Sequence, residues 1–435
     1  MNLKYVFKFF LLSIVFWGVN VQAQSKNQQL AHEILTNPDF TKVLQKGDSL
    51  LSSGFNAGSG YQQVWIRDFN TFINNSLRVL PKSTVRSALL KFFYFQGFDG
   101  NMVDGYEQIG PNAKIDNYGR FTRYDMPGYA FHKNTVETDQ ESSLVQAVYK
   151  YIRITKDTTI LAVTVHGHTV QDRLDRALQY LMNFRFDKKY GLIWGATTAD
   201  WGDVQPLGKW GVKYDENSQP AIDIYDNAMF VIALRDFIEM SHNPAQKTKW
   251  RKIYREVKTN VHKYLWDQKH LKFRPHVYIQ NDPFHGFNEN KIYYHGGTAV
   301  AIKAGLLSRK QVLEAYRKME SDVREAGAQT IGLTMYPAYP KGSFQNPGMG
   351  PYSYQNGGDW TWFGARMITD LVRYGFVKQA YRAIQPMVHR VIKNKGFYEW
   401  YTVSGKPQGS AKFKGSAGEL MEAIESLQHW AKRHQ

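Results

Sequence analysis

The chain has 435 residues, of which 43% are hydrophobic and 15% aromatic, and it contains no cysteine. The lack of cysteine excludes disulfides, thiolate nucleophiles and cysteine-based metal sites. The formal net charge is +17, but lysine and arginine are spread along the chain and form no basic arm. Because no nucleic-acid reader motif is present either, we expect no nucleic-acid partner and leave an acidic glycan as an open alternative.

The first 23 residues have the pattern of a secretory signal. Lys4 and Lys8 precede a short apolar run over 9–17, and small residues end at Ala23, ahead of a cleavage site. The run is too short to span a membrane comfortably, and no later stretch approaches the roughly 20 apolar residues that a span needs. We predict a periplasmic or secreted protein without stable membrane insertion, with residues 24–435 as one domain. A retained membrane anchor is the alternative.

Apolar spacing after this segment is almost entirely helical. The clearest example is the set Leu420, Met421, Ile424 and Leu427, which lies on one helical face. The pattern predicts thirteen helices, near 28–36, 40–52, 68–79, 82–96, 139–155, 167–184, 221–241, 245–266, 294–306, 309–325, 358–374, 376–394 and 416–432.

The lengths of the connections between these helices predict how they are arranged. Turns of a few residues, as at 80–81 and 374–375, join neighbouring helices and make them antiparallel. The predicted pairs are 68–79 with 82–96, 221–241 with 245–266, 294–306 with 309–325, and 358–374 with 376–394. Long loops rich in Gly, Pro, Tyr and Trp separate the pairs, at 97–138, 186–220, 267–293, 326–357 and 395–415. The sequence therefore predicts an all-α (α/α)6 toroid with its cleft at the long-loop end. A helical solenoid or an irregular all-α domain is the alternative, although no repeated side-chain signature is visible.

Two of the aromatic-rich loops bring acidic residues close to tryptophan. The stretch 61–69 contains Trp65, Arg67 and Asp68 at the start of a predicted helix, where the charged pair would bind sugar hydroxyls or only cap the helix. In the loop 194–203, Asp200 and Asp203 flank Trp201. Partial burial against this indole would raise a carboxyl pKa, as a general acid requires. A turn with ordinary aspartate capping is the alternative.

Two further loops have the composition of a carbohydrate cleft. The run Tyr-Gln-Asn-Gly-Gly-Asp-Trp occupies 354–360, and Gly-Phe-Tyr-Glu-Trp-Tyr occupies 396–401, so that Glu399 stands among large aromatics. Aromatic faces stack on sugar rings while carboxylates act on hydroxyls and the reacting carbon. Inverting glycoside hydrolysis needs two carboxyl groups roughly 6.5–9.5 Å apart, with room for a water. The alternative is that Glu399 is a surface acid beside packing aromatics.

Other reaction types find no support in the sequence. It has no Gly-x-Ser-x-Gly elbow, no glycine-rich phosphate loop and no His-Glu-x-x-His helix. His166 and His168 lie near a predicted helix start and are interpreted as surface residues, and the other histidines are scattered. No motif requires a metal or a cofactor.

The motifs at 64–69, 354–360 and 397–401, taken in this order, resemble those of the (α/α)6-barrel inverting glycoside hydrolases. The chain is similar to the alkaline/neutral invertases, the glycogen-debranching glucosidases and the processing α-glucosidases. The resemblance implies that Arg67 and Asp68 bind the sugar and that the 354–360 loop lines the cleft. It also implies that Glu399, followed here by Trp-Tyr where the family has Tyr-Tyr, is the general base. The acid of these families is an aspartate of the middle loop, for which Asp203 is the first choice and Asp200 the second.

We therefore expect an exported inverting glycosidase that acts on an α-glucoside or a related oligosaccharide. The residues expected to stack on sugar faces are Trp65, Trp201, Trp360, Trp400 and Tyr401. Those expected to hold hydroxyls are Arg67, Asp68, Gln355 and Asn356. A polysaccharide lyase on an acidic glycan, a sugar epimerase and a non-catalytic glycan-binding protein are the alternatives.

Overall fold

The computed structural model describes residues 25–110, 120–123 and 125–435. The predicted signal segment lies outside these residues. Within them, no helix has both the length and the apolar character needed to cross a membrane.

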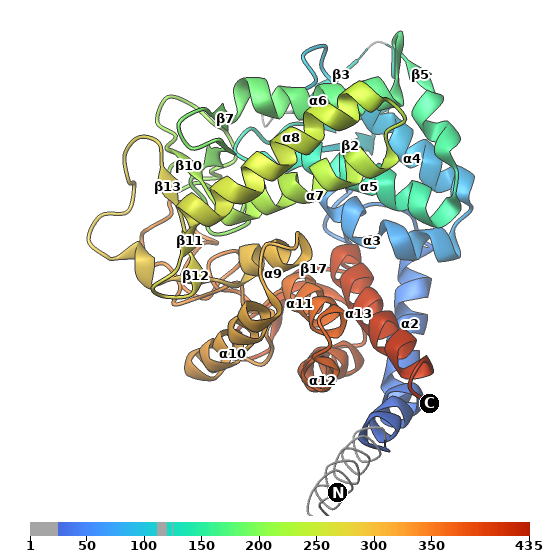
Figure 1. Cartoon of the computed structure of the whole chain (residues 1–435), viewed down its shortest axis with the longest axis vertical. Helices are drawn as coiled ribbons and strands as arrows, with labels where there is room; N and C mark the ends of the chain where they lie inside the picture. The colour runs from blue at the N-terminus through green and yellow to red at the C-terminus, as the bar shows by residue number, and fades with distance from the viewer. Residues whose placement is uncertain (1–24, 111–119, 124) are drawn as a thin grey trace, which may run out of the picture.

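Six helices form the inner ring of the structure. Each contacts the next in chain order, and the sixth contacts the first, so the ring closes. Figure 1 shows them in the middle of the molecule. They are α3 (Ile66–Val79), α5 (Gln140–Thr155), α7 (Ile224–Met240), α9 (His295–Lys303), α11 (Thr361–Arg373) and α13 (Lys414–Lys432).

Six further helices cover the ring from outside. Figure 1 shows α6 and α8 on one side of the molecule and α10 and α12 on the opposite side. Residues 25–36 are also helical and lead into α2, and a short π-helix, η2 (Val261–Leu265), extends α8. The outer helices are α2 (Pro38–Leu51), α4 (Lys82–Tyr94), α6 (Val170–Phe184), α8 (Pro244–Asn260), α10 (Arg309–Ala326) and α12 (Val377–Lys393).

The predicted (α/α)6 fold is therefore confirmed, and most helix ends lie within a few residues of their predicted positions. The hairpins α3–α4, α7–α8, α9–α10 and α11–α12 are those expected from the short turns. Ring closure depends on a close approach of α13 to α3. A Cβ atom on Gly418 would lie 2.5 Å from the Cβ of Phe72, so only glycine allows this packing.

The long loops contain short antiparallel strands, which the all-α prediction did not include. One sheet has the order β1 (Val64–Trp65), β2 (Gly105–Gln108), β4 (Tyr129–His132), β3 (Arg120–Thr122). Strands of two or three residues carry little sequence signal, since pairing with a neighbour rather than intrinsic preference stabilises them. The other pairings are β9 (Gly195–Ala196) with β10 (Pro220–Ile222) and β13 (Val277–Tyr278), β14 (Tyr293–Tyr294) with β15 (Met335–Tyr336), β16 (Tyr398–Tyr401) with β17 (Pro407–Ala411), β5 (Thr164–Val165) with β6 (His168–Thr169), β7 (Phe186–Asp187) with β8 (Leu192–Ile193), and β11 (Trp266–Asp267) with β12 (Lys272–Phe273).

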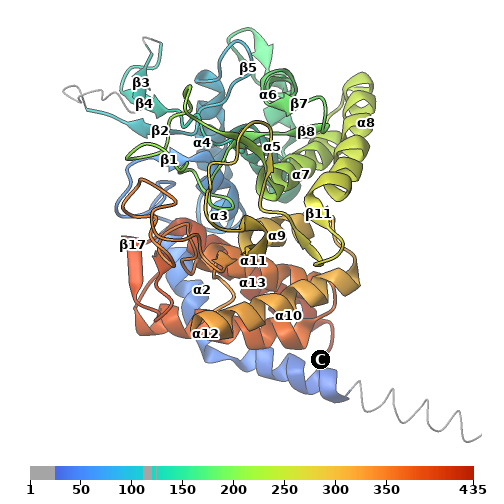
Figure 2. The same ribbon diagram turned by 90° about the vertical axis from the view of Figure 1, so that its left-hand side faces the viewer.

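Several of these strands lead directly into inner helices. Strand β1 precedes α3, β10 precedes α7, β14 precedes α9 and β17 precedes α13. Figure 2 shows β1 to β4 and β17 together along one side of the molecule. The loops that were predicted to carry the chemistry are thus held at the N-terminal ends of the inner ring.

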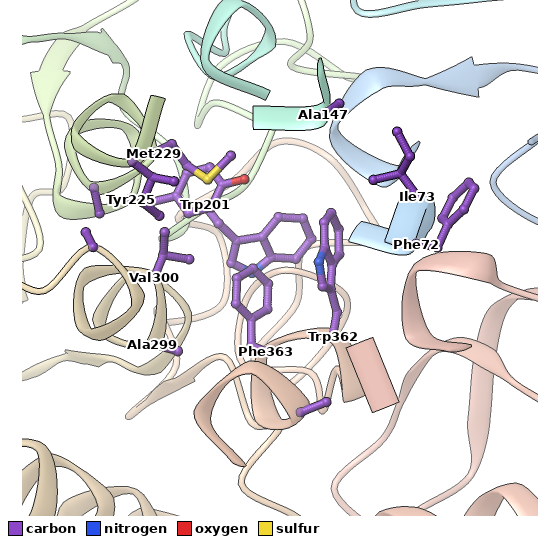
Figure 3. Close-up of a cluster of buried hydrophobic side chains, with 14 of the residues drawn as sticks. Phe72, Ile73, Ala147, Trp201, Tyr225, Met229, Ala299, Val300, Trp362 and Phe363 are labelled. Carbon is purple, nitrogen blue, oxygen red and sulfur yellow. The ribbon is translucent and has the colours of Figure 1, made fainter. Parts of the chain in front are cut away.

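Aromatic side chains fill the centre of the ring below these loops. The ring centroid of Trp201 lies 4.7 Å from that of Trp360, 5.4 Å from that of Trp362 and 4.9 Å from that of Phe363. Figure 3 shows Trp201, Trp362 and Phe363 together, with side chains of α3, α5, α7 and α9 around them. A loop residue, Trp201, is therefore fixed by the core of the ring, and this anchors the segment that contains Asp203.

Candidate active site

A cavity of about 250 Å³ lies at the N-terminal ends of the inner helices and contains both predicted catalytic carboxylates. Eight of the eleven predicted site residues line it, from four separate loops. The lining residues are Ala57, Tyr61, Trp65, Arg67, Asp68, Asp104, His132, Lys133, Asn134, Trp201, Asp203, Val212, Tyr354, Gln355, Trp360, Trp362, Glu399 and Phe413.

Glu399 is held in place by an irregularity of the hairpin β16–β17. The pairing register shifts between Tyr398 and Trp400, so β17 contributes one extra residue opposite Glu399. The backbone N–H of Ser410 donates to Oε2 of Glu399 at 2.7 Å. The neighbouring Gly409 has φ +67°, and a Cβ atom there would lie 2.5 Å from the same oxygen. The bulge therefore both directs the carboxylate and supplies a hydrogen bond to it.

The second oxygen of Glu399 faces the cavity wall, where the Tyr61 hydroxyl donates to Oε1 at 3.0 Å. Glu399 is only 4% exposed. Burial raises its pKa to about 6, although the hydrogen bonds from Ser410 and Tyr61 favour the ionised form and oppose this shift. The group thus changes its charge close to neutral pH.

Asp203 is the more open of the two carboxylates, with 22% of its side chain exposed. The side-chain amide of Gln355 donates to its Oδ1, and Arg67 Nη2 lies 3.8 Å from its Oδ2. The preceding Gly202 allows the amide to approach, because a Cβ atom there would lie 2.7 Å from Gln355 Oε1.

Arg67 joins Asp203 to a group of buried acids. Its guanidinium pairs with Glu137 and lies 3.7 Å from Asp139. Two more acids, Asp68 and Asp104, are buried at the cavity, and burial raises the pKa of each to about 7, opposed by the charge of Arg67. One oxygen of each has no hydrogen-bond partner among the described residues. These carboxyl groups are therefore available to a ligand that carries hydroxyl groups.

Indole rings form the floor of the cavity. Trp360 donates its Nε1–H to the Tyr354 carbonyl at 2.9 Å, whereas the Nε1–H groups of Trp201 and Trp362 are buried without a partner in the described part of the chain. Trp65 lies at the edge, with its ring 5.2 Å from that of His132. Apolar faces combined with unpaired donors and acceptors suit a sugar ring better than a purely apolar ligand.

The structure does not bring Asp200 to this cavity. Its backbone has φ +57°, and its carboxylate accepts hydrogen bonds from the Gly297 N–H at 2.9 and 3.1 Å. Asp200 thus stabilises the first turn of α9, and the pKa rise expected from burial beside Trp201 occurs at this residue. Asp200, the second choice for the acid, therefore lies outside the lining of the cavity that contains Asp203 and Glu399.

Three predicted sugar-binding residues also lie away from the cavity. The side-chain amide of Asn356 bonds the backbone N–H of Tyr339 at 2.7 Å and its carbonyl at 3.1 Å, so it joins two loops. Trp400 packs against Tyr354, with ring centroids 6.3 Å apart. Tyr401 is fully buried beneath Arg390, which lies 3.9 Å from the ring centroid. Each has a structural role in this fold.

Several lining residues were not predicted. Tyr61, Tyr354 and Trp362 lie inside or beside the recognised motifs, so the motifs themselves indicated them. Asp104 and the run 132–134 have no such signal. They reach the cavity because β2 pairs with β1 and β4, and because the Ile66 N–H donates to the Asp104 carbonyl at 2.8 Å.

A closed ring of six helical hairpins, with paired carboxylates and indoles at the N-terminal ends of its inner helices, defines the class of (α/α)6 glycoside hydrolases. The family model described as amylo-alpha-1,6-glucosidase matches residues 129–412. The chain belongs to this glycoside hydrolase family, as the sequence motifs predicted.

Solved structures show the same fold in distant proteins. A GH63 mannosylglycerate hydrolase from Thermus thermophilus, in complex with glucose, aligns with TM-score 0.60 and 15% identity over 87% of this chain and 99% of its own. The same hydrolase with Tris and D-glycerate aligns with TM-score 0.58 and 14% identity over 88% and 98%. A rhamnosidase from Klebsiella oxytoca with rhamnose bound aligns with TM-score 0.58 and 13% identity over 89% of this chain but only 63% of its own. No curated protein sequence matches the chain.

Proposed function

We propose that this glycoside hydrolase is exported and cleaves an α-glucoside or a related short oligosaccharide with inversion. The observation that carries the proposal is the meeting of Asp203 and Glu399, from loops far apart in sequence, in one indole-floored cavity. Inverting hydrolysis requires two carboxyl groups that share a site and act on opposite sides of one bond.

In this mechanism Asp203 donates a proton to the glycosidic oxygen while Glu399 accepts one from the attacking water. The C–O bond to the leaving group breaks as the bond to the water oxygen forms, so an α-glucoside yields a β-product. Two features support these roles. Glu399, with a pKa of about 6, is ionised as a base must be at neutral pH. Asp203 is the more exposed of the two, which suits an acid that protonates a leaving group on its way to solvent.

The same two acids in exchanged roles are the second candidate. A raised pKa is the usual property of the acid, and that of Glu399 is raised. Arg67 Nη2 lies 3.8 Å from Oδ2 of Asp203, so a cation stands beside the carboxyl group that would act as base. These observations favour Glu399 as acid and Asp203 as base, and experiment must separate the two assignments.

The size of the cavity supports a substrate that inserts a single sugar ring. About 250 Å³ is small for a ligand site, and the free polar atoms of Asp68, Asp104, Trp201 and Trp362 surround it. The family description names an α-1,6-glucosidase, and a structural neighbour was solved with glucose. A terminal glucosyl unit is therefore the ligand that we propose for this cavity.

The two assignments are tested with Asp203→Asn and Glu399→Gln on maltose, isomaltose and α-glucosyl fluoride. Both variants should lose about 10³-fold or more of kcat on the disaccharides. A fluoride ion leaves without being protonated. The variant that lacks the general acid should therefore keep much of its rate on α-glucosyl fluoride, whereas the variant that lacks the general base should lose it. Retention by Asp203→Asn supports the proposed roles, and retention by Glu399→Gln supports the exchanged ones.

Near-wild-type rates in either variant on the disaccharides would remove that residue from the mechanism. Proton NMR of the first product should show β-glucose, and α-glucose would exclude inversion. Asp200→Asn is the matched control, because this aspartate lies three residues from Asp203 but bonds the start of α9.

Export is supported by the composition of residues 1–23. N-terminal sequencing of the protein from the periplasm or medium should begin near Gln24. A product that begins at Met1 would contradict cleavage of the signal.

A further inference from the structure

A second cavity, of about 530 Å³, is lined by both residues of strand β13, a strand that Figure 1 shows on the left of the molecule. None of its lining residues belongs to the cavity with the catalytic pair, and the proposed reaction does not use it. We call it the 263–290 pocket. Its lining residues are Tyr190, Lys263, Tyr264, Arg274, His276, Val277, Tyr278, Asp282, Phe287, Asn288, Glu289 and Asn290.

The floor of the 263–290 pocket is a carboxylate held by three side chains. His276 Nδ1 lies 2.7 Å from Glu289 Oε1, the Tyr278 hydroxyl donates to Oε2 at 2.8 Å, and the Tyr339 hydroxyl donates to Oε1 at 2.5 Å. Burial would raise the pKa of Glu289, but His276 and the hydroxyl donors outweigh it and lower the pKa. Glu289 therefore presents a fixed negative charge.

His276 adds a polar atom that the protein itself does not use. Its side chain is fully buried, and Nε2 has no hydrogen-bond partner among the described residues. His276 lines the pocket, and because Nδ1 is engaged with Glu289, Nε2 is the ring nitrogen that the described residues leave without a partner. A buried polar group without a partner costs free energy, which a bound hydroxyl would recover.

Aromatic rings and charged side chains of both signs form the walls of the pocket. Tyr190 and Tyr264 meet edge to face, with centroids 5.2 Å apart, and Lys263 lies 4.7 Å from the centroid of Tyr264. Arg274 is exposed and also lines the pocket. Two cations, Lys263 and Arg274, thus share the lining with two carboxylates, Asp282 and Glu289.

We propose that the 263–290 pocket is a second carbohydrate-binding site, which holds an uncharged segment of an oligosaccharide away from the bond that is cleaved. Balanced charges around aromatic rings suit a neutral polyol, since hydroxyls donate to carboxylates and accept from cations while a ring face stacks on tyrosine. An acidic glycan would meet Glu289 at the floor. The inference rests on the proposed function only in the choice of an α-glucan as the first probe.

The test measures binding without turnover, by titration calorimetry of the Glu399→Gln protein with maltoheptaose, isomaltotetraose and mannotetraose. We expect a binding event that Tyr264→Ala, added to Glu399→Gln, weakens about tenfold or more through the lost ring contact. Tyr254→Ala is the matched control. Tyr254 is also half-buried and has a lysine, Lys258, 5.4 Å from its ring centroid, but it lines neither cavity.

Identical isotherms with and without Tyr264→Ala, or no binding of any neutral probe, would overturn the inference. If hexagalacturonate bound more tightly than the neutral probes and this binding depended on Tyr264, the conclusion that the pocket prefers an uncharged glycan would be overturned. If the wild-type protein failed to hydrolyse these sugars, only the proposed function would be contradicted. Binding that depends on Tyr264 is measured separately, in the Glu399→Gln protein, which does not turn over substrate.

Discussion

Gln355 donates a hydrogen bond from its side-chain amide to Oδ1 of Asp203, across 152 positions of sequence. The loop of Gln355 is itself fixed, because its carbonyl accepts from the Thr334 hydroxyl at 3.1 Å and the adjacent Asn356 bonds the backbone of Tyr339. The orientation of Asp203 therefore depends on a rigid neighbour rather than on its own loop.

Replacing Gln355 with Ala should lower kcat by about 10- to 100-fold, because a carboxyl group displaced by about 1 Å transfers its proton poorly. The free energy of unfolding should change little, since the amide binds at the cavity edge. Steady-state kinetics on an α-glucoside checks this result. Gln345→Ala is the control, because Gln345 accepts from the Gly208 N–H at 2.9 Å in the same pair of loops but does not line the cavity. Equal kcat in both variants would exclude a positioning role.

The pH dependence of kcat/KM should have an acid limb near pH 6, because the free enzyme needs ionised Glu399 and its pKa is about 6. The Tyr61 hydroxyl lowers this pKa by stabilising the carboxylate. Tyr61→Phe should therefore move the limb to higher pH, by about one unit. Tyr398→Phe, beside Glu399 but outside the cavity lining, should leave it in place. A limb that moves to lower pH in Tyr61→Phe would contradict this interpretation.

Glu399 should also reduce the stability of the protein at neutral pH. Its pKa is about 6 in the folded state against 4.5 for an ordinary glutamate, so the folded state binds more protons between these values. Stability is lost as pH rises through this window and stays lower above it. Glu399→Gln should gain up to about 2 kcal/mol relative to wild type at about pH 8, but not at about pH 4.

Urea unfolding at the two pH values measures this difference. Glu422→Gln gives a control of opposite sign. Burial would raise the pKa of Glu422, but Lys303 and Lys150 outweigh it and lower the pKa, so this variant should lose stability at the higher pH. If Glu399→Gln raised the free energy of unfolding equally at both pH values, burial of a charged Glu399 would not be the cause of the gain in stability.

Asp200→Ala should destabilise the fold by about 2–3 kcal/mol, because the buried Gly297 N–H at the start of α9 loses its acceptor. Asp200→Asn should cost less, since its amide oxygen still accepts from Gly297. Thermal unfolding measures both changes. If Asp200→Asn instead kept full stability and lost catalysis as severely as Asp203→Asn, the acid would have to be reassigned to Asp200.

The helical part of the fold was predictable because apolar residues recur at helical spacing and because short turns leave antiparallel packing as the only geometry. The motifs likewise indicated Asp203 and Glu399. The choice between Asp200 and Asp203 could not be made from sequence, because it depends on a left-handed backbone at Asp200 that turns its carboxylate toward α9.

Trp400, which was predicted to stack on a sugar, does not line the cavity, and the physical reason is a different one. Residues 398–401 form a strand, and alternation along a strand places Trp400 on the face opposite Glu399. Asp104 was missed because its position at the cavity depends on the register of β1, β2 and β4, which no local pattern of the sequence encodes.

The contact of α13 with α3 has a consequence for the order of assembly. These helices stand at opposite ends of the described chain, and Glu399 lies on the hairpin that leads into α13. On the ribosome, Arg67, Asp68 and Asp203 therefore emerge long before their partner carboxylate does. Contacts between segments so far apart in sequence form slowly. The enzyme should therefore become active late in folding, when α13 packs against α3 and closes the ring.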